Sequence, residues 1–138
     1  MKELYLTEEE KGISGEQLEK MLDDLLVQYP DAKKVLIIPP DYTRCYSYAG
    51  EITQLLYKKL SPSAQIDVMP ALGTHMAMNE DEMQKFFGDV VPRDRIIVHH
   101  WQTDTVCLGY VPAEVCSEIS NGLFPEQIDV EVNHLLVD

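Results

Sequence analysis

The 138-residue sequence lacks several features that would assign it to a class at once. No apolar run approaches the roughly 20 residues that a transmembrane helix needs, and residues 1–12 contain no apolar core of a signal peptide. Lysine and arginine are scarce, at 11 against 24 acidic residues, which gives a formal net charge of −13. Such an acidic chain argues against nucleic acid or an anionic membrane surface as a partner. We therefore expect a cytoplasmic protein.

Cysteine is also rare, and no spacing typical of a metal site is present. Cys45, Cys107 and Cys116 are far apart and odd in number, which predicts free thiols in a reducing compartment and no metal ligands among them. No serine lies in a G-x-S-x-G context, which argues against an α/β-hydrolase. The length suits one domain with a real core. We expect residues 1–138 to form a single α/β domain, with residues 1–12 as a mobile arm or an edge segment.

What is present is a hydrophobic pattern that predicts four helices. Capping-box residues at Ser14–Gln17 and Asn79–Glu82 each precede apolar residues at helical spacing. The first of these helices is predicted to end at Tyr29–Asp31 and the second at Gly88. Two further helices are predicted over Ala49–Leu60 and Pro112–Gly122.

Short apolar runs between these helices predict strands. They cover Val35–Ile38, Gln65–Met69, Arg95–His99, Val106–Val111 and Ile128–Val132, and Leu135–Val137 resembles the start of another core strand. The first run is apolar throughout, which is typical of a parallel strand with both faces covered. We predict an α/β fold with a layered, Rossmann-like, mostly parallel sheet flanked by helices, and with ligand loops at the carboxyl ends of the strands.

Two polar loops follow the first two predicted strands. Because parallel strands joined by crossover helices end at the same side of a sheet, we expect both loops to line one crevice. The polar or conformationally special residues of the two loops are Asp41, Thr43, Arg44, Gly73, Thr74 and His75.

The chemistry of these residues suits a small anionic substrate. Arg44 can hold a carboxylate or phosphate through two parallel hydrogen bonds, and Asp41 can orient Arg44 or accept a hydroxyl proton. His75 is the natural general base, and Gly73 lets backbone N–H groups approach an anion closely. Structural alternatives remain open for each: Asp41 as a turn or N-cap residue, Arg44 as the partner of a surface carboxylate, and His75 as a packing residue.

At these loops the chain resembles the nickel-pincer-dependent lactate racemase family. The segment Pro40–Arg44 resembles the family's P-D-x-T-R, and Ala71–His75 resembles its A-L-G-T-H. Met78–Glu82 is similar to the M-T-E-E-E run that follows. His99–Gly109 is similar to the family's H-D…D…L-G region, and Val130–Asn133 to its V-x-V-N strand.

The resemblance implies a racemase or epimerase of 2-hydroxy acids that uses a nickel-pincer nucleotide. A base removes the hydroxyl proton while the C2 hydride moves to the cofactor, and hydride return to the other face inverts the centre. By resemblance His75 is a catalytic histidine, Arg44 holds the substrate carboxylate and Asp41 is a neighbouring acid. We expect Thr43, Gly73 and Thr74 to contact the cofactor.

The resemblance also implies an incomplete site. The second catalytic histidine, the tethering lysine and the nickel-ligating histidine of the family lie beyond residue 138, so we expect an N-terminal portion of a two-domain enzyme, with the missing C-terminal domain as its partner. We expect these 138 residues alone to be inactive. Cys45 and Met76-Ala77 replace residues common in the family beside the substrate loops, which argues against lactate itself. The alternative is a stand-alone module that binds small carboxylates without catalysis.

Overall fold

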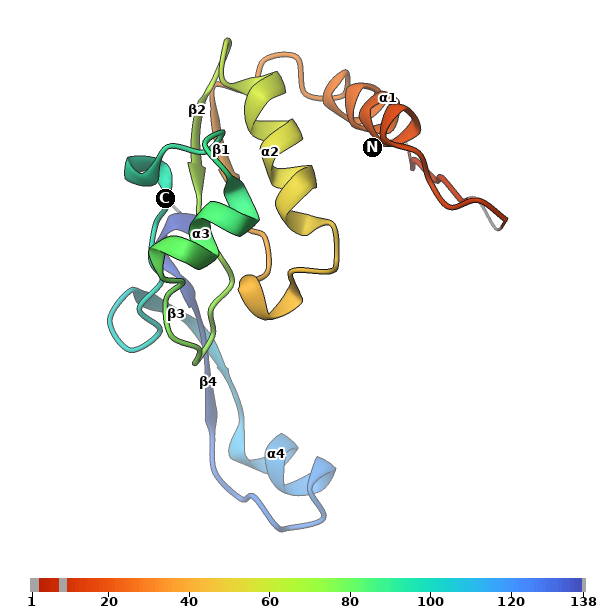
Figure 1. Cartoon of the computed structure of the whole chain (residues 1–138). Coiled ribbons are helices and arrows are strands. Elements are labelled where there is room, and N and C mark those ends of the chain that lie inside the picture. Colours follow the sequence, from red (N-terminus) through yellow and green to blue (C-terminus); the bar gives the residue numbers. More distant parts are fainter. Residues whose placement is uncertain (1–2, 8–9, 138) are drawn as a thin grey trace. The chain divides into compact units, whose positions relative to one another are not determined.

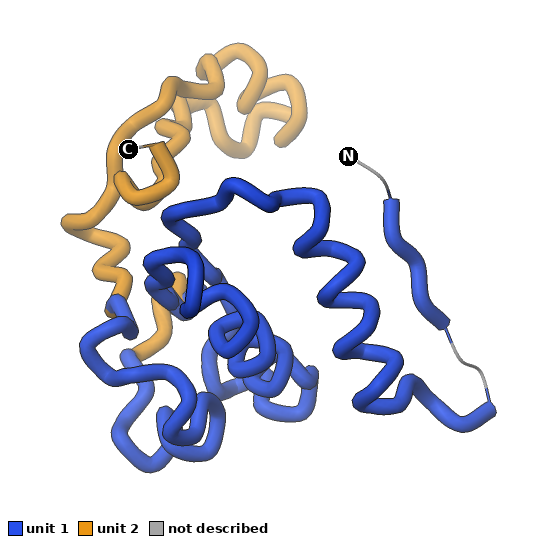
Figure 2. The backbone as a smooth tube through the Cα atoms, turned by 90° about the horizontal axis from the view of Figure 1, so that it is seen from above, with its two compact units in different colours: residues 1–71, 77–97 blue, residues 72–76, 98–138 orange. Residues whose placement is uncertain are grey.

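In the computed structural model, which describes residues 3–7 and 10–137, four α-helices and two two-stranded sheets form the regular structure of the described residues. Figure 1 shows these elements, and Figure 2 shows the two units to which they belong. Unit 1 comprises residues 1–71 and 77–97, and unit 2 comprises residues 72–76 and 98–138. The predicted α/β class is confirmed, with one parallel and one antiparallel sheet. The predicted arm at residues 1–12 falls partly on residues 1, 2, 8 and 9, outside the described part of the chain.

The sheet of unit 1 is a parallel pair. Strand β1 (Lys34–Ile37) pairs with β2 (Gln65–Val68), and the pairing continues past both strands in a bridge between Pro40 and Ala71. The two strands therefore end beside each other, as the apolar runs predict. Their connection contains helix α2 (Ala49–Leu60), which makes a strand–helix–strand unit.

The predicted strand Arg95–His99 is wrong. In its place, Arg93–Arg95 is a 3₁₀ turn, η2, and Ile96 alone forms a bridge to Val68. The N–H groups of Arg95 and Ile96 donate to the carbonyls of Pro92 and Arg93, at 3.0 and 3.2 Å. Because these groups are already used in the turn, they are not available for a strand ladder.

Helices α1 (Gly15–Leu26) and α3 (Glu80–Phe87) begin at complete capping boxes, which confirms both predictions. In α3 the Asn79 side chain accepts from the N–H of Glu82 at 3.0 Å, and the Glu82 carboxylate accepts from the N–H of Asn79 at 2.9 Å. Gly88 ends α3 with φ +58°, as predicted. Helix α1 ends at Leu26, short of the predicted end at Tyr29–Asp31.

The core of unit 1 lies between α2, α3 and β2. Its buried members are Val68, Met78, Phe86, Phe87 and Val91. Phe86 and Phe87 pack edge to face with ring centroids 4.9 Å apart. The apolar positions that predicted the buried face of α3 therefore do form the core.

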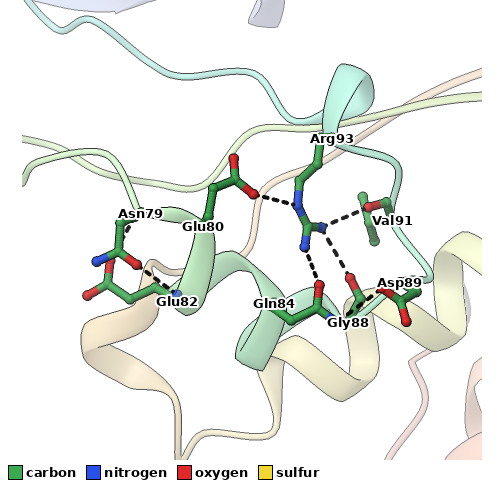
Figure 3. A network of polar contacts seen from close by, with 8 residues as sticks. All are labelled: Asn79, Glu80, Glu82, Gln84, Gly88, Asp89, Val91 and Arg93. Carbon is green, nitrogen blue, oxygen red and sulfur yellow. Dashed lines mark hydrogen bonds and ion pairs between the residues drawn. The ribbon is translucent and has the colours of Figure 1, made fainter.

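Arg93 ties the end of α3 to the chain that follows it (Figure 3). Its guanidinium donates to the carbonyls of Gly88 and Val91 at 3.1 and 3.3 Å and to the Gln84 side chain at 2.7 Å. It also lies 3.4 Å from a carboxylate oxygen of Glu80. These bonds link the Gln84 side chain on α3 to two backbone carbonyls of the segment that follows the helix.

Unit 2 contains an antiparallel ribbon of β3 (Thr105–Val111) and β4 (Ile128–Asn133), joined through helix α4 (Ala113–Ile119) (Figure 1). A β-bulge interrupts the ladder between Cys107 and Gly109. These elements confirm the predicted strands and helix of this region within a few residues.

The predicted core strand at Leu135–Val137 is wrong, because His134–Leu136 is a 3₁₀ turn, η3. The side-chain oxygen of Asn133 accepts from the N–H of Leu135 at 2.9 Å and caps this turn. A capping asparagine redirects the chain locally, so the apolar run does not continue as a strand.

The three cysteines are free thiols, which confirms that prediction. Within the described residues, no helix has the length and apolar character needed to cross a membrane.

Candidate functional site

The first predicted loop is an ordered turn built on Asp41. This residue is only 5% exposed and is the N-cap of the 3₁₀ turn η1 (Tyr42–Arg44). Its carboxylate oxygen Oδ1 accepts from the backbone N–H of Thr43 at 3.0 Å and also from the Thr43 hydroxyl. The N-cap role that the sequence left open as an alternative is therefore present, and it engages one carboxylate oxygen.

Arg44 ends this turn with an exposed side chain. Among residues 3–7 and 10–137, no ion pair or hydrogen bond engages the Arg44 guanidinium. The turn beneath it is anchored, because the ring of Tyr42 packs edge-on against Phe86 at 6.2 Å and Cys45 packs against the core of unit 1. A planar cation held above an anchored turn is suited to binding a carboxylate in two parallel hydrogen bonds.

The second predicted loop forms a tight turn in unit 2. The N–H of His75 donates to the carbonyl of Leu72 at 2.9 Å, and Leu72 is buried. Gly73 has φ +55°, a conformation that other residues rarely adopt, and no atom would crowd a Cβ placed there. Glycine therefore suits the left-handed backbone of this turn, and its role in close approach to an anion stays a prediction. Thr74 and His75 are exposed.

The structure thus groups the predicted residues into two sets. Asp41, Thr43 and Arg44 share one turn of unit 1, and the turn Gly73–His75 belongs to unit 2. The chain enters the two turns from the adjacent ends of β1 and β2, beyond the bridge between Pro40 and Ala71. That both sets line one crevice stays a prediction.

A polar cluster that the sequence did not predict lies at the base of the β3–β4 ribbon. The Oδ1 atom of Asn133 accepts from Leu135, so its amide donates through Nδ2 to Nδ1 of His99 at 2.9 Å. His99 is therefore the tautomer that carries its proton on Nε2. His99 and Asn133 are 34 residues apart, so no local spacing could have indicated the pair.

His100 and Asp104 form the second part of this cluster. The Asp104 carboxylate accepts from the backbone N–H of His100 at 2.8 Å and lies 3.1 Å from the His100 ring. The pKa of Asp104 is lowered, first by the His100 backbone N–H and also by the Thr103 hydroxyl and the His100 ring. In the described part of the chain, no group of three or more His, Cys, Asp or Glu side chains could hold a metal ion.

A cavity of about 620 Å³ lies elsewhere in unit 1, between residues 6–18 and the start of α2. Its walls include Leu6, Lys11, Leu18, Tyr48 and Ile52. None of the predicted site residues lines it, so it does not bear on their roles.

Comparison with known proteins assigns the family. The model of the lactate racemase N-terminal domain matches residues 7–137. A crystal structure of a Thermotoga maritima protein is similar, with a TM-score of 0.73 and 28% sequence identity over 89% of this chain. The chain spans 30% of the length of that relative. No curated protein matches significantly. The match over nearly all of the sequence shows that this chain belongs to the lactate racemase N-terminal domain family.

Proposed function

We propose that this chain supplies the substrate-binding part of a racemase or epimerase of 2-hydroxy acids. The observation that carries the proposal is the Asp41–Thr43–Arg44 turn, which presents an exposed arginine on an anchored scaffold within a domain of the lactate racemase family. In this proposal Arg44 binds the substrate carboxylate. The buried Asp41 orients Arg44 by holding the turn that carries it.

His75 is proposed as the group that accepts the proton of the substrate hydroxyl. Imidazole exchanges protons near neutral pH, which suits a base in a reversible reaction. Inversion at C2 by oxidation and reduction needs both this proton transfer and a hydride acceptor. The family's nickel-pincer nucleotide supplies hydride acceptance when it is bound.

The described residues contain no group of three or more His, Cys, Asp or Glu side chains that could by itself hold a metal ion. Thr43, Gly73 and Thr74 offer only hydroxyl and backbone donors, and their contact with the cofactor stays a prediction. We therefore propose that residues of a partner domain hold the cofactor, and that the 138 residues alone do not invert a 2-hydroxy acid.

A binding module without catalysis is the second candidate. It needs only the ordered turn that presents Arg44. The two candidates differ in one outcome, which is turnover when a cofactor-bearing partner domain is added. Inversion of the C2 centre by the pair supports the racemase, and carboxylate binding without inversion supports the module.

The experiment compares binding of lactate and propionate by titration calorimetry. Both carry a carboxylate, but only lactate carries the 2-hydroxyl. Arg44→Gln is expected to weaken both ligands about ten-fold or more, because a charge-assisted bidentate contact is lost. His75→Gln is expected to reduce only the preference for lactate over propionate.

Arg95→Gln is the matched control, since it removes the same charge from a half-exposed arginine that pairs with Asp67. It should leave both affinities unchanged. Unchanged affinity of Arg44→Gln for both ligands would refute the assignment of Arg44 to the carboxylate.

A further inference from the structure

The register of the β3–β4 ribbon separates its side chains into an apolar and a polar face. Val106 pairs with Val132, Gly109 with Val130 and Val111 with Ile128. Paired residues share a face, and residues two apart in a strand share it as well. The bulge between Cys107 and Gly109 adds one residue to β3. Val106 and Gly109 therefore lie on the same face, although they are three residues apart. The apolar face consists of Val106, Val111, Ile128, Val130 and Val132.

Several side chains of this apolar face are exposed. Ile128 is 47% exposed, Val130 42% and Val106 37%. The opposite face carries the carboxylates of Asp129 and Glu131 beside their cross-strand partners Tyr110 and Cys107. A two-stranded ribbon is marginally stable unless an apolar face packs against another layer. Contiguous exposed apolar side chains of this kind mark an interaction surface.

The charge around this face favours a basic partner. All lysines and arginines of the sequence lie before residue 96, so unit 2 contains none. The described residues of unit 2 carry six carboxylates: Asp104, Glu114, Glu118, Glu126, Asp129 and Glu131. A second copy of a chain with net charge −13 would meet the same negative charge, which opposes self-association through this face.

We propose that the apolar face of the β3–β4 ribbon docks the polypeptide that forms the rest of a lactate-racemase-type protein, through a surface with an apolar centre and a lysine- or arginine-rich rim. The inference rests on the proposed function. It is carried by the length of the Thermotoga maritima relative, of which this chain matches 30%, and by the charge of unit 2. The remaining part of such a protein is a partner large enough to cover the ribbon.

The experiment titrates this chain with the part of the Thermotoga maritima relative outside the matched region. That part is purified as a separate polypeptide, and its fold is checked by circular dichroism. A one-to-one complex is expected, with affinity that falls as salt rises. Val130→Gln on the apolar face is expected to weaken binding about ten-fold or more, because it places an amide without a hydrogen-bond partner in an apolar interface. Glu131→Gln places the same side chain on the opposite face and is expected to change affinity about two-fold at most.

Val106→Gln tests the same face on the other strand, in case Val130→Gln fails to fold. Absence of a complex, or equal losses in the Val130 and Glu131 variants, would overturn the proposal. Dimerisation of the chain alone, abolished by Val130→Gln, would assign the face to a second copy and overturn it too. Loss of lactate binding in Arg44→Gln is measured separately. A complex without an Arg44 effect would retain the docking surface and reject the proposed function.

Discussion

The carboxylate of Asp41 holds the turn that carries Arg44 by accepting two hydrogen bonds from Thr43, one from its backbone N–H at 3.0 Å and one from its hydroxyl. The carbonyl of the same aspartate accepts from the N–H of Arg44 at 3.0 Å. A buried acid thus fixes the backbone of an exposed cation that lies three residues further along the chain. The position of Arg44 therefore depends on a residue that need not touch the substrate.

Asp41→Ala is expected to lower the free energy of unfolding by about 1 kcal/mol, the usual cost of losing an N-cap. It should also weaken carboxylate binding, because the turn that presents Arg44 loses its cap. Thr43→Val is the control, since it removes only the hydroxyl donor and should cost about 0.5–1 kcal/mol. Urea unfolding and ligand titration measure the two effects, and equal stability of wild type and Asp41→Ala would contradict the role of the cap.

Gly50→Ala is expected to destabilise unit 1 by about 1–3 kcal/mol, the cost of overpacking a close contact. Gly50 lies in α2 against the backbone carbonyl of Phe86, and a Cβ there would lie 3.1 Å from the Phe86 ring as well. The backbone of Phe86 in α3 cannot move out of the way as the end of a flexible side chain can. Gly15→Ala in α1 is the matched control, because no atom lies within 4 Å of its Cβ position. It should stabilise by about 0.5 kcal/mol in the same urea titration.

Arg93→Ala is expected to lower stability by about 1–2 kcal/mol, because two carbonyls lose a charged donor at a half-exposed site. Gly88 and Val91 supply these carbonyls (Figure 3). Arg95→Ala is the matched control, because it removes an arginine that makes a partly exposed ion pair with Asp67 at 3.4 Å, and it should lower stability by about 0.5 kcal/mol or less. Thermal unfolding of the two variants compares the loss of an arginine that donates to two backbone carbonyls with the loss of an arginine in one surface ion pair. Similar melting temperatures would refute the larger contribution of Arg93.

Asp104 is expected to titrate below its ordinary pKa of 3.8, because the His100 backbone N–H stabilises its charged form. A lowered pKa in the folded state means that the stabilisation is present above pH 3.8. It is lost as the pH falls through the folded-state pKa. The stability difference between wild type and Asp104→Asn should therefore disappear in acid below that range. NMR titration of the Asp104 carboxyl measures the pKa directly.

Thr103→Val is the control for this titration, because the Thr103 hydroxyl contributes to the lowering. The pKa of Asp104 in this variant should rise part of the way toward 3.8. An Asp104 pKa at or above 3.8 in the wild type would show that its bonds to His100 are not kept in solution.

The elements that the sequence predicted well are those fixed by neighbours along the chain. The capping boxes at Ser14 and Asn79 depend on residues three positions apart, and the end of α3 depends on Gly88 itself. The apolar runs indicated the positions of β1 and β2, but no residue of β1 is buried, so the expectation that both faces of this strand are covered is wrong. The residues of the two loops, and the family, were likewise recognisable from short motifs.

What the tertiary structure decided depends on groups far apart in sequence or on competition for the same hydrogen bonds. Arg95–His99 has the apolar content of a strand, but its first N–H groups bond within a turn. Asn133 both ends β4 and orients His99, and this pairing across 34 residues leaves no periodic signal. Periodicity reports which side of an element is apolar. The hydrogen-bond partner of each polar group is determined only when distant segments pack together.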